Sequence, residues 1–353
     1  MITENAPLCQ TKNNKIPVIE LQNWQKSLTD SKLTIKDLLN YLSLTPDDFK
    51  SHNNGLLIQG KLDFPLRVPL PFISRMKKGD INDPLLQQVL PFQLENKITK
   101  NFSFDPLNES EKNILPGVIH KYKNRVLMLA TAACAINCRY CFRRHFPYKE
   151  NQINRKEWDE AFHYINNNKE IDEIILSGGD PLTNNNNQIK WFIDNLKKIK
   201  HIKTLRIHSR LPIVIPERID KGIIDCLNSW ENKKVFVIHS NHANEIDYNV
   251  KKSIEKIKKT DALLLNQSVL LKGVNDKSSD LIMLSKRLFS IGVLPYYVHL
   301  LDKVQGAAHF DVCEDDAKKI MSEVRDSLPG YLVPKLVKEL PNKKSKTLIV
   351  PEE

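Results

Sequence analysis

Short apolar segments alternate with amphipathic stretches along most of the second and third thirds of the chain. The apolar segments have the length of buried strands, and the stretches between them repeat apolar residues with a helical period. The predicted strands cover 126–130, 171–176, 204–208, 234–238, 262–267 and 294–298. The predicted helices cover 155–168, 187–199, 216–229, 247–259, 278–291 and 314–327. Alternation of this kind predicts an α/β fold with a parallel sheet covered by helices.

Six strand–helix units predict a partial (β/α)6 barrel over residues 116–330. Such barrels bind ligands at the carboxyl ends of their strands, and polar residues follow the first four predicted strands. The proline-rich segment before the barrel, residues 1–115, predicts an N-terminal accessory region of short helices. One of these helices is predicted to begin at Thr34, because Asp37 three residues later completes a capping box. Residues 331–353 are predicted to form a short C-terminal lid.

The composition indicates a globular protein and disfavours membrane-spanning, secreted and nucleic-acid-binding classes, but it does not indicate a function. A hydrophobic share of 41% in 353 residues is enough for a sizeable core, and no apolar run has membrane-spanning length. The N-terminus carries Glu4 and Pro7 in place of the basic start and apolar run of a signal peptide. We therefore expect a cytoplasmic protein without a membrane partner. The net charge of +11 is spread over the chain without a stripe of interleaved aromatic and basic residues, which disfavours nucleic acid and leaves an acidic protein partner open.

The densest chemical signal is three cysteines within eight residues, Cys134, Cys138 and Cys141. A loop this short can bring three thiolates to one point, whereas a closed iron–sulfur cluster or a structural zinc site usually has four protein ligands. Three ligands on a four-iron cluster leave one iron open to a small molecule. The alternatives are a zinc site completed by His145 and a buried cysteine cluster without metal. The cysteines outside this motif are predicted to be free thiols: Cys9, Cys226 and Cys313.

This C-x3-C-x2-C spacing resembles the radical S-adenosylmethionine (radical SAM) superfamily. The resemblance implies that the three thiolates hold a [4Fe–4S] cluster. It also implies that the open iron binds the methionine part of SAM, whose cleavage yields a hydrogen-abstracting radical. A Gly-Gly-Asp turn by itself is usually only a turn, but here it follows the next strand and resembles the element that holds the methionine amino group. The SAM-binding residues implied in this way are Tyr140, Ser177, Gly178, Gly179 and Asp180.

A wider resemblance, to the lysine 2,3-aminomutase family and its elongation factor P β-lysylation branch, covers roughly residues 65–350. The stretches that carry it are 125–146, 176–182, 267–276 and 295–310, and the last looks particular to the elongation factor P branch. The family carries pyridoxal phosphate (PLP) on a C-terminal lysine, and Ser345–Lys346–Thr347 matches that element. The glycines that usually precede it are replaced, so Lys343 and Lys344 remain alternatives to Lys346.

The same resemblance implies the rest of the site. The residues implied to bind the PLP phosphate are Lys121, Arg125 and Arg210. Those implied to bind the substrate are Arg143, for the α-carboxylate, and Asp276 and Glu339, for the ε-ammonium. The implied cofactors are thus the [4Fe–4S] cluster, SAM and PLP.

The implied reaction is the isomerisation of L-lysine to (R)-β-lysine. Its implied partners are a reducing protein such as flavodoxin, the ligase that attaches the product to elongation factor P, and further copies of the chain in a homo-oligomer. One alternative is a free-lysine 2,3-aminomutase of catabolism or osmolyte synthesis. Such enzymes carry a longer, cysteine-containing C-terminal segment, whereas only Thr347–Glu353 follows Lys346 here. The other alternative is a non-catalytic metal- or nucleic-acid-binding protein.

Overall fold

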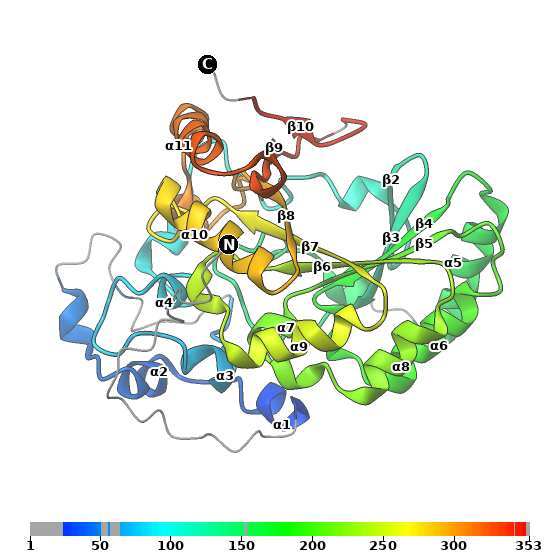
Figure 1. The fold of residues 1–353 in the computed structure, drawn as a ribbon, viewed down its shortest axis with the longest axis horizontal. Helices are drawn as coiled ribbons and strands as arrows, with labels where there is room; N and C mark the ends of the chain where they lie inside the picture. Colours follow the sequence, from blue (N-terminus) through cyan, green and yellow to red (C-terminus); the bar gives the residue numbers. More distant parts are fainter. Residues whose placement is uncertain (1–23, 51–55, 57–63, 152–153, 342, 351–353) are drawn as a thin grey trace.

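The computed structural model describes residues 24–50, 56, 64–151, 154–341 and 343–350. One ten-stranded sheet, in which every strand lies beside its neighbours in sequence, organises the chain (Figure 1). The strands are β1 Asn113–Leu115, β2 Val118–Tyr122, β3 Arg125–Thr131, β4 Glu173–Gly178, β5 Thr204–Ser209, β6 Lys233–His239, β7 Leu263–Val269, β8 Leu294–His299, β9 Lys335–Lys338 and β10 Thr347–Leu348. Strands β3 to β9 are parallel, and antiparallel hairpins extend the sheet at both ends.

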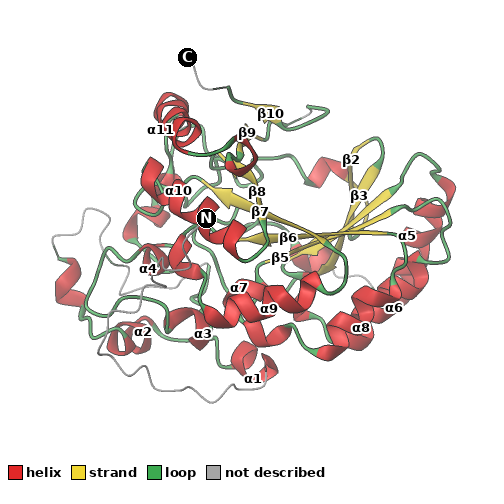
Figure 2. Ribbon diagram, in the orientation of Figure 1, coloured by secondary structure: helices red, strands yellow, loops and turns green. Residues whose placement is uncertain are grey.

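Helices connect the parallel strands, and α5, α6, α8 and α9 lie along one side of the sheet (Figure 2). The barrel helices are α5 Arg155–Asn167, α6 Asn186–Leu196, α7 Leu211–Val214, α8 Lys221–Ser229, α9 Tyr248–Lys258, α10 Ser278–Ser290 and α11 Glu314–Ser327. The helices before the barrel are α1 Trp24–Thr29, α2 Ile35–Tyr41, α3 Leu70–Ile73 and α4 Pro84–Gln87. Short 3-10 turns join these elements.

The structure confirms the predicted α/β class and all six predicted strands, which are β3 to β8. The sheet is open, with β1 and β10 at its two ends, and β9 adds a seventh parallel strand. Thr34 caps α2 in the predicted capping box. The helix expected over 216–229 is divided, because Asp220 accepts a hydrogen bond from the backbone of Ile223 and begins α8 there. The hairpins β1–β2 and β9–β10 escaped the sequence patterns because their strands are short and polar.

One continuous apolar core joins the N-terminal region to the barrel. Trp24, Leu38 and Phe72 pack into the same cluster as the barrel residues Leu176 and Phe236. The N-terminal region is therefore part of the folded body in the described residues, while the predicted boundaries near 115 and 330 stay predictions. No helix in the described ranges combines the length and the apolar character needed to cross a membrane.

Candidate active site

The cysteine loop begins directly after β3, at the carboxyl edge of the parallel sheet. Cys134, Cys138 and Cys141 are partly buried free thiols. Burial raises the pKa of Cys134 and Cys141, and the charges of neighbouring cysteines in the loop raise it further. The three thiolates would thus repel one another in a poorly solvated place, which favours binding to a cationic iron centre.

Two arginines of the loop are fixed by one carboxylate of the N-terminal region. Glu95 accepts hydrogen bonds from Arg139 Nε at 2.9 Å and from Arg144 Nη2 at 2.7 Å. All three side chains are at most 5% exposed. Because Arg139 and Arg144 lie on either side of Cys141, Glu95 braces the loop at the third cysteine.

Arg210, which the resemblance implies for the PLP phosphate, lies against the cysteine loop. Its Nη1 lies 2.6 Å from Cys138 Sγ and 2.7 Å from the Tyr140 hydroxyl. Its Nη2 bonds Gln88 at 2.6 Å and Glu245 at 3.1 Å. These contacts anchor Arg210 at the cysteine loop, and its role toward PLP stays a prediction.

The glycines of the turn after β4 pack closely against the start of the cysteine loop. A Cβ on Gly178 would lie 2.3 Å from Thr131 O, and one on Gly179 would lie 2.3 Å from Ala133 O. Glycine is therefore required here because the backbone packs against the start of the cysteine loop.

The carboxylate of Asp180 is occupied within the protein. It accepts hydrogen bonds from Leu182 N, Ser209 Oγ, Arg210 N and Leu211 N, at 2.7 to 3.2 Å. A carboxylate has about four acceptor positions, so these four bonds engage the whole group. Asp180 thus ties the end of β4 to the end of β5, and its contact with SAM stays a prediction.

At the other end of the site, the β9–β10 hairpin positions Lys346. Thr347 pairs with Lys338, and this register sets Lys346 opposite Glu339. The Lys346 amine bonds Glu339 Oε2, and Lys121 Nζ lies 3.3 Å from Glu339 Oε1. Burial opposes ionisation of Glu339, but Lys346 and Lys121 lower its pKa to about 2. The alternatives Lys343 and Lys344 are exposed, whereas the Lys346 side chain is 23% exposed.

A continuous series of opposite charges joins the two ends of the site. It runs from Lys346 through Glu339, Lys121 and Glu109 to Arg143, two residues after Cys141. Glu109 and Arg143 are buried, with Arg143 Nε 2.7 Å from Glu109 Oε2. Sequence patterns gave no sign of Glu109, which lies in an irregular segment before β1.

Asp302 is a second residue that the sequence analysis missed. It follows β8 by three residues, and a signal was present, since other strand ends also carry polar residues. Burial and the nearby charge of Glu339 raise the pKa of Asp302 to about 7. Its carboxyl group has no hydrogen-bond partner in the described part of the chain. Asp302 and Glu339 thus offer two carboxyl groups to a cation.

Asp276 and Arg125 lie outside this arrangement to different degrees. Asp276 is partly exposed and lies near Asp280. Burial raises the pKa of Asp280, and the charge of Asp276 raises it further. The charge of Asp276 thus acts on Asp280, whereas the charges of Glu339, Lys346, Glu109 and Lys121 act on Asp302. Arg125 lies 4.2 Å from the ring centre of Tyr122, whose hydroxyl is 3.3 Å from Glu339 Oε1. The structure therefore brings Arg125 near the Lys346 end and places Asp276 beside Asp280.

Three histidines line the barrel interior between the two ends: His208, His239 and His299. Burial lowers the pKa of each one, to about 4 for His239 and about 3 for His299, and the charge of Lys346 acts in the same direction. Among the residues that the structure describes, the Nε2 atoms of His208 and His299 find no hydrogen-bond partner. These neutral rings leave polar atoms available to a group held beside Lys346.

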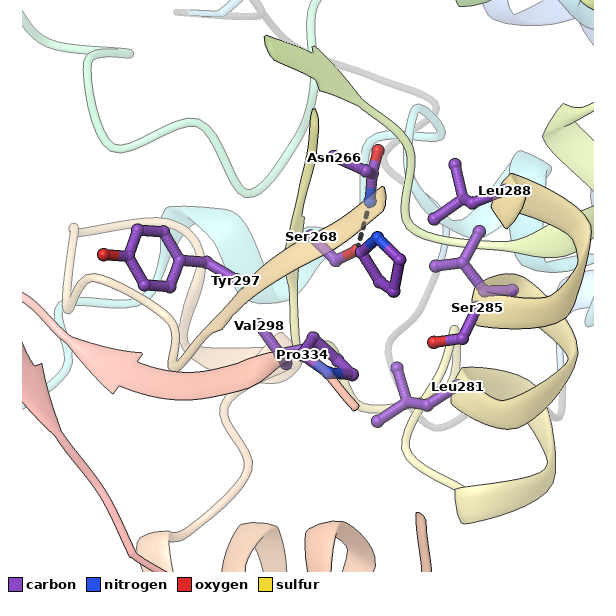
Figure 3. A pocket seen from close by; sticks show the side chains of 10 residues that line it. Asn266, Ser268, Leu281, Ser285, Leu288, Tyr297, Val298 and Pro334 are labelled. Carbon is purple, nitrogen blue, oxygen red and sulfur yellow. Dashed lines mark hydrogen bonds between the residues drawn. The ribbon is translucent and has the colours of Figure 1, made fainter. Parts of the chain in front are cut away.

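One small cavity lies beside the sheet, and another lies at the site. The cavity in Figure 3 lies between α10 and strands β7 and β8, where Asn266 Nδ2 donates to Ser268 Oγ at 2.9 Å. Its lining is mostly apolar and includes no residue of the cysteine loop, which marks it as a packing gap. The other cavity is bordered by Glu109, Arg143 and the loop around Phe146.

The donor set fits the implied cofactors better than a single metal ion. Within the described residues, no group of three or more His, Cys, Asp or Glu side chains is spaced to hold one ion, and His145 Nε2 lies 3.1 Å from Gln305 O. A four-iron cluster is larger and takes its thiolates farther apart. Lys346, with a partly exposed amine beside Lys121 and the unpartnered histidine nitrogens, fits a phosphorylated aldehyde such as PLP. Cys226 and Cys313 are free, as predicted, and Cys9 lies outside the described residues.

Comparison with known proteins supports the same chemistry. The radical SAM superfamily matches residues 128–223. The L-lysine 2,3-aminomutase of Escherichia coli (strain K12) is 47% identical, covering 92% of this chain and 94% of the relative. That of Haemophilus influenzae is also 47% identical, covering 94% and 97%. That of Clostridium subterminale is 32% identical, covering 93% of this chain and 78% of the relative.

Proposed function

We propose that this chain, which belongs to the lysine 2,3-aminomutase family of radical SAM enzymes, converts L-lysine to (R)-β-lysine with PLP as its second cofactor. It is an isomerase, so the non-catalytic binding protein is set aside. The observation that carries the proposal is the series of charges from Lys346 to Arg143. It connects an amine suited to PLP with the loop suited to the cluster.

Each end of the site has a distinct task. Cys134, Cys138 and Cys141 would hold the cluster, and Lys346 would hold PLP. When bound, the cluster with SAM supplies a hydrogen-abstracting radical, and PLP supplies a conjugated system that lets the amino nitrogen migrate. The chain itself fixes the geometry: Glu95 braces the cysteine loop, and the β9–β10 hairpin sets the position of Lys346.

Substrate lysine carries one carboxylate and two amino groups, and the site offers a partner for each charged end. Arg143 suits the α-carboxylate, because a guanidinium binds a carboxylate through two parallel hydrogen bonds. Asp302 and Glu339 suit the ε-ammonium, because a weakly solvated cation requires an anionic partner. This assignment replaces Asp276 by Asp302 in the role first given to Asp276.

We also propose that the product serves modification of elongation factor P. Identity is 47% with the Escherichia coli and Haemophilus influenzae relatives and 32% with the Clostridium subterminale relative. The match covers 94% and 97% of the first two relatives and 78% of the third, which supports the shorter elongation factor P branch. The stretch 295–310, which contains Asp302, is the sequence feature that favours it. Free lysine for catabolism is the competing use of the same reaction.

The test is an anaerobic assay of the reconstituted enzyme with SAM, PLP, dithionite and L-lysine, analysed for β-lysine on a chiral column. Formation of (R)-β-lysine supports the reaction, and SAM cleavage without β-lysine contradicts it. Adding purified elongation factor P and its lysylation ligase then tests the use of the product. A mass increase on elongation factor P that requires this enzyme supports the role, and its absence favours catabolism.

A further inference from the structure

One side of the Arg143 guanidinium is hydrogen-bonded to a carboxylate of the protein itself. Glu109 accepts from Nε at 2.7 Å and from Nη2 at 2.9 Å, which is a two-point contact along one side of the guanidinium. Nη1 makes longer contacts, at 3.2 Å to Gly178 O and 3.5 Å to Ser177 Oγ. A guanidinium has five N–H donors. Glu109 takes the N–H of Nε and one N–H of Nη2. Of the others, one on Nη1 and one on Nη2 point in parallel from the end of the guanidinium, and among the described residues the only contacts that compete for this pair are the longer ones of Nη1.

Glu109 is itself held in place. Asp105 accepts hydrogen bonds from Glu109 N at 3.0 Å and Ser110 N at 3.1 Å, which shapes the loop that carries Glu109. Lys121 Nζ lies 3.4 Å from Glu109 Oε1. Burial opposes ionisation of the Glu109 carboxyl, but Arg143 and Lys121 outweigh it and lower its pKa. The partner of Arg143 is thus a fixed carboxylate.

The surroundings leave Arg143 room to turn if that carboxylate is lost. A small cavity borders both Glu109 and Arg143 between the loops around Phe104 and Phe146. An arginine side chain has many rotamers of similar energy, so a neighbouring cavity offers it alternative positions. Among the described residues, the two-point contact with Glu109 restrains the direction of the guanidinium most strongly, because its two bonds are the shortest and are charge-assisted.

We propose that Glu109 is a positioning residue for substrate recognition: it occupies one side of the Arg143 guanidinium and aims the remaining pair of N–H groups at the α-carboxylate of the amino acid substrate. This inference rests on the proposed function, since it assumes an amino acid in the site. It gives the N-terminal region a direct part in substrate selection, beyond its part in the core.

The test compares Glu109→Gln with Glu173→Gln in the reconstituted enzyme. Glu173 is a matched control, because it also binds an arginine at two points, Arg206 Nε at 3.0 Å and Nη2 at 2.6 Å. It lies at the first residue of β4, at the opposite end of the strand from the cysteine loop. Binding of L-lysine and of L-lysinamide, which lacks the carboxylate charge, is measured by equilibrium dialysis without reductant. Steady-state assays then separate KM from kcat.

For Glu109→Gln we expect the Kd for L-lysine to be about tenfold higher and its KM to rise as well, because a misdirected guanidinium loses a charge-assisted contact with the substrate carboxylate. Binding of L-lysinamide, kcat, iron content and SAM cleavage without lysine should change little. Glu173→Gln should leave both Kd values near wild type. Glu109→Asp, which keeps the charge but shortens the side chain, should give an intermediate Kd and covers the case in which the Gln variant folds poorly.

Three results would overturn the inference. Unchanged or tighter binding of L-lysine by Glu109→Gln would make Glu109 a competitor or a purely structural residue. Equal weakening for L-lysine and L-lysinamide would show a general disturbance, as would equal weakening by Glu173→Gln. A wild-type enzyme that binds L-lysine but forms no β-lysine would instead count against the proposed function, and the dialysis comparison would still decide the role of Glu109.

Discussion

Replacing Asp302 by Asn should strongly weaken the binding of lysine, while the same change at Asp276 should not. Asp302 and Glu339 provide two carboxyl groups beside Lys346, whereas Asp276 lies near Asp280. Asparagine keeps the size of aspartate and removes its charge. The comparison therefore tests which of the two aspartates faces the ε-ammonium of the substrate.

The expected size of the effect follows from the surroundings of Asp302. A hydrogen bond to a charged group contributes about 1.5–3 kcal/mol, and Glu339 remains as a second anionic partner. The Kd for L-lysine should thus rise on the order of 10- to 100-fold in Asp302→Asn. It should stay within about twofold in Asp276→Asn, as for most surface substitutions.

The pH dependence of lysine binding gives a second, independent test of the role of Asp302. The pKa of Asp302 is raised to about 7, so the group is mostly neutral below that pH and mostly ionised above it. The ε-ammonium of lysine stays charged throughout this range, because its pKa is about 10.4. Binding of lysine should therefore strengthen as the pH rises from about 6 to 8 in the wild type. Asp302→Asn should flatten this change.

Equilibrium dialysis of L-lysine at several pH values, with SAM binding as the control, measures both effects. A larger loss in Asp276→Asn than in Asp302→Asn would refute the assignment drawn from the structure. So would a pH profile that is unchanged in Asp302→Asn. Equal losses of lysine and SAM binding would indicate damage to the fold.

Three further predictions concern the two ends of the site. Lys346→Ala should abolish the absorbance of bound PLP and most β-lysine formation while iron content stays near wild type; borohydride labelling of Lys343 or Lys344 in the wild type would move the PLP site instead. Alanine at Cys134, Cys138 or Cys141 should each remove the four-iron absorbance, whereas serine at Cys9, Cys226 and Cys313 together should not; the reverse pattern would place the cluster elsewhere. Glu95→Gln should speed the loss of iron to a chelator, because it leaves Arg139 and Arg144 buried with a weakened partner, which costs about 3 kcal/mol; unchanged release, or equal release from the exposed-pair control Glu314→Gln, would show that the brace is dispensable.

The sequence by itself determined the features that depend on neighbours along the chain. Strand and helix positions follow from apolar periodicity, which is why β3 to β8 and their helices match the predicted ranges closely. The cysteine motif is equally local, because three thiols within eight residues meet in almost any loop. The position of Lys346 rests on a match to a family element, and its role stays a prediction.

Only the tertiary structure decided which charges meet. Glu109 and Arg143 are 34 residues apart, and Lys121 and Glu339 are 218 apart. A buried charge requires a partner of opposite charge. From the sequence alone, any acidic residue at the carboxyl edge of the sheet is an equally good candidate for that partner. The register of β9 and β10 places Glu339 in the site, and the packing of the N-terminal region places Glu109 and Glu95 there. These two features therefore determine which acidic residues pair with the buried cations. The same packing used the hydrogen-bonding capacity of Asp180 and Arg210 inside the protein, so residue type and strand-end position could not reveal their roles.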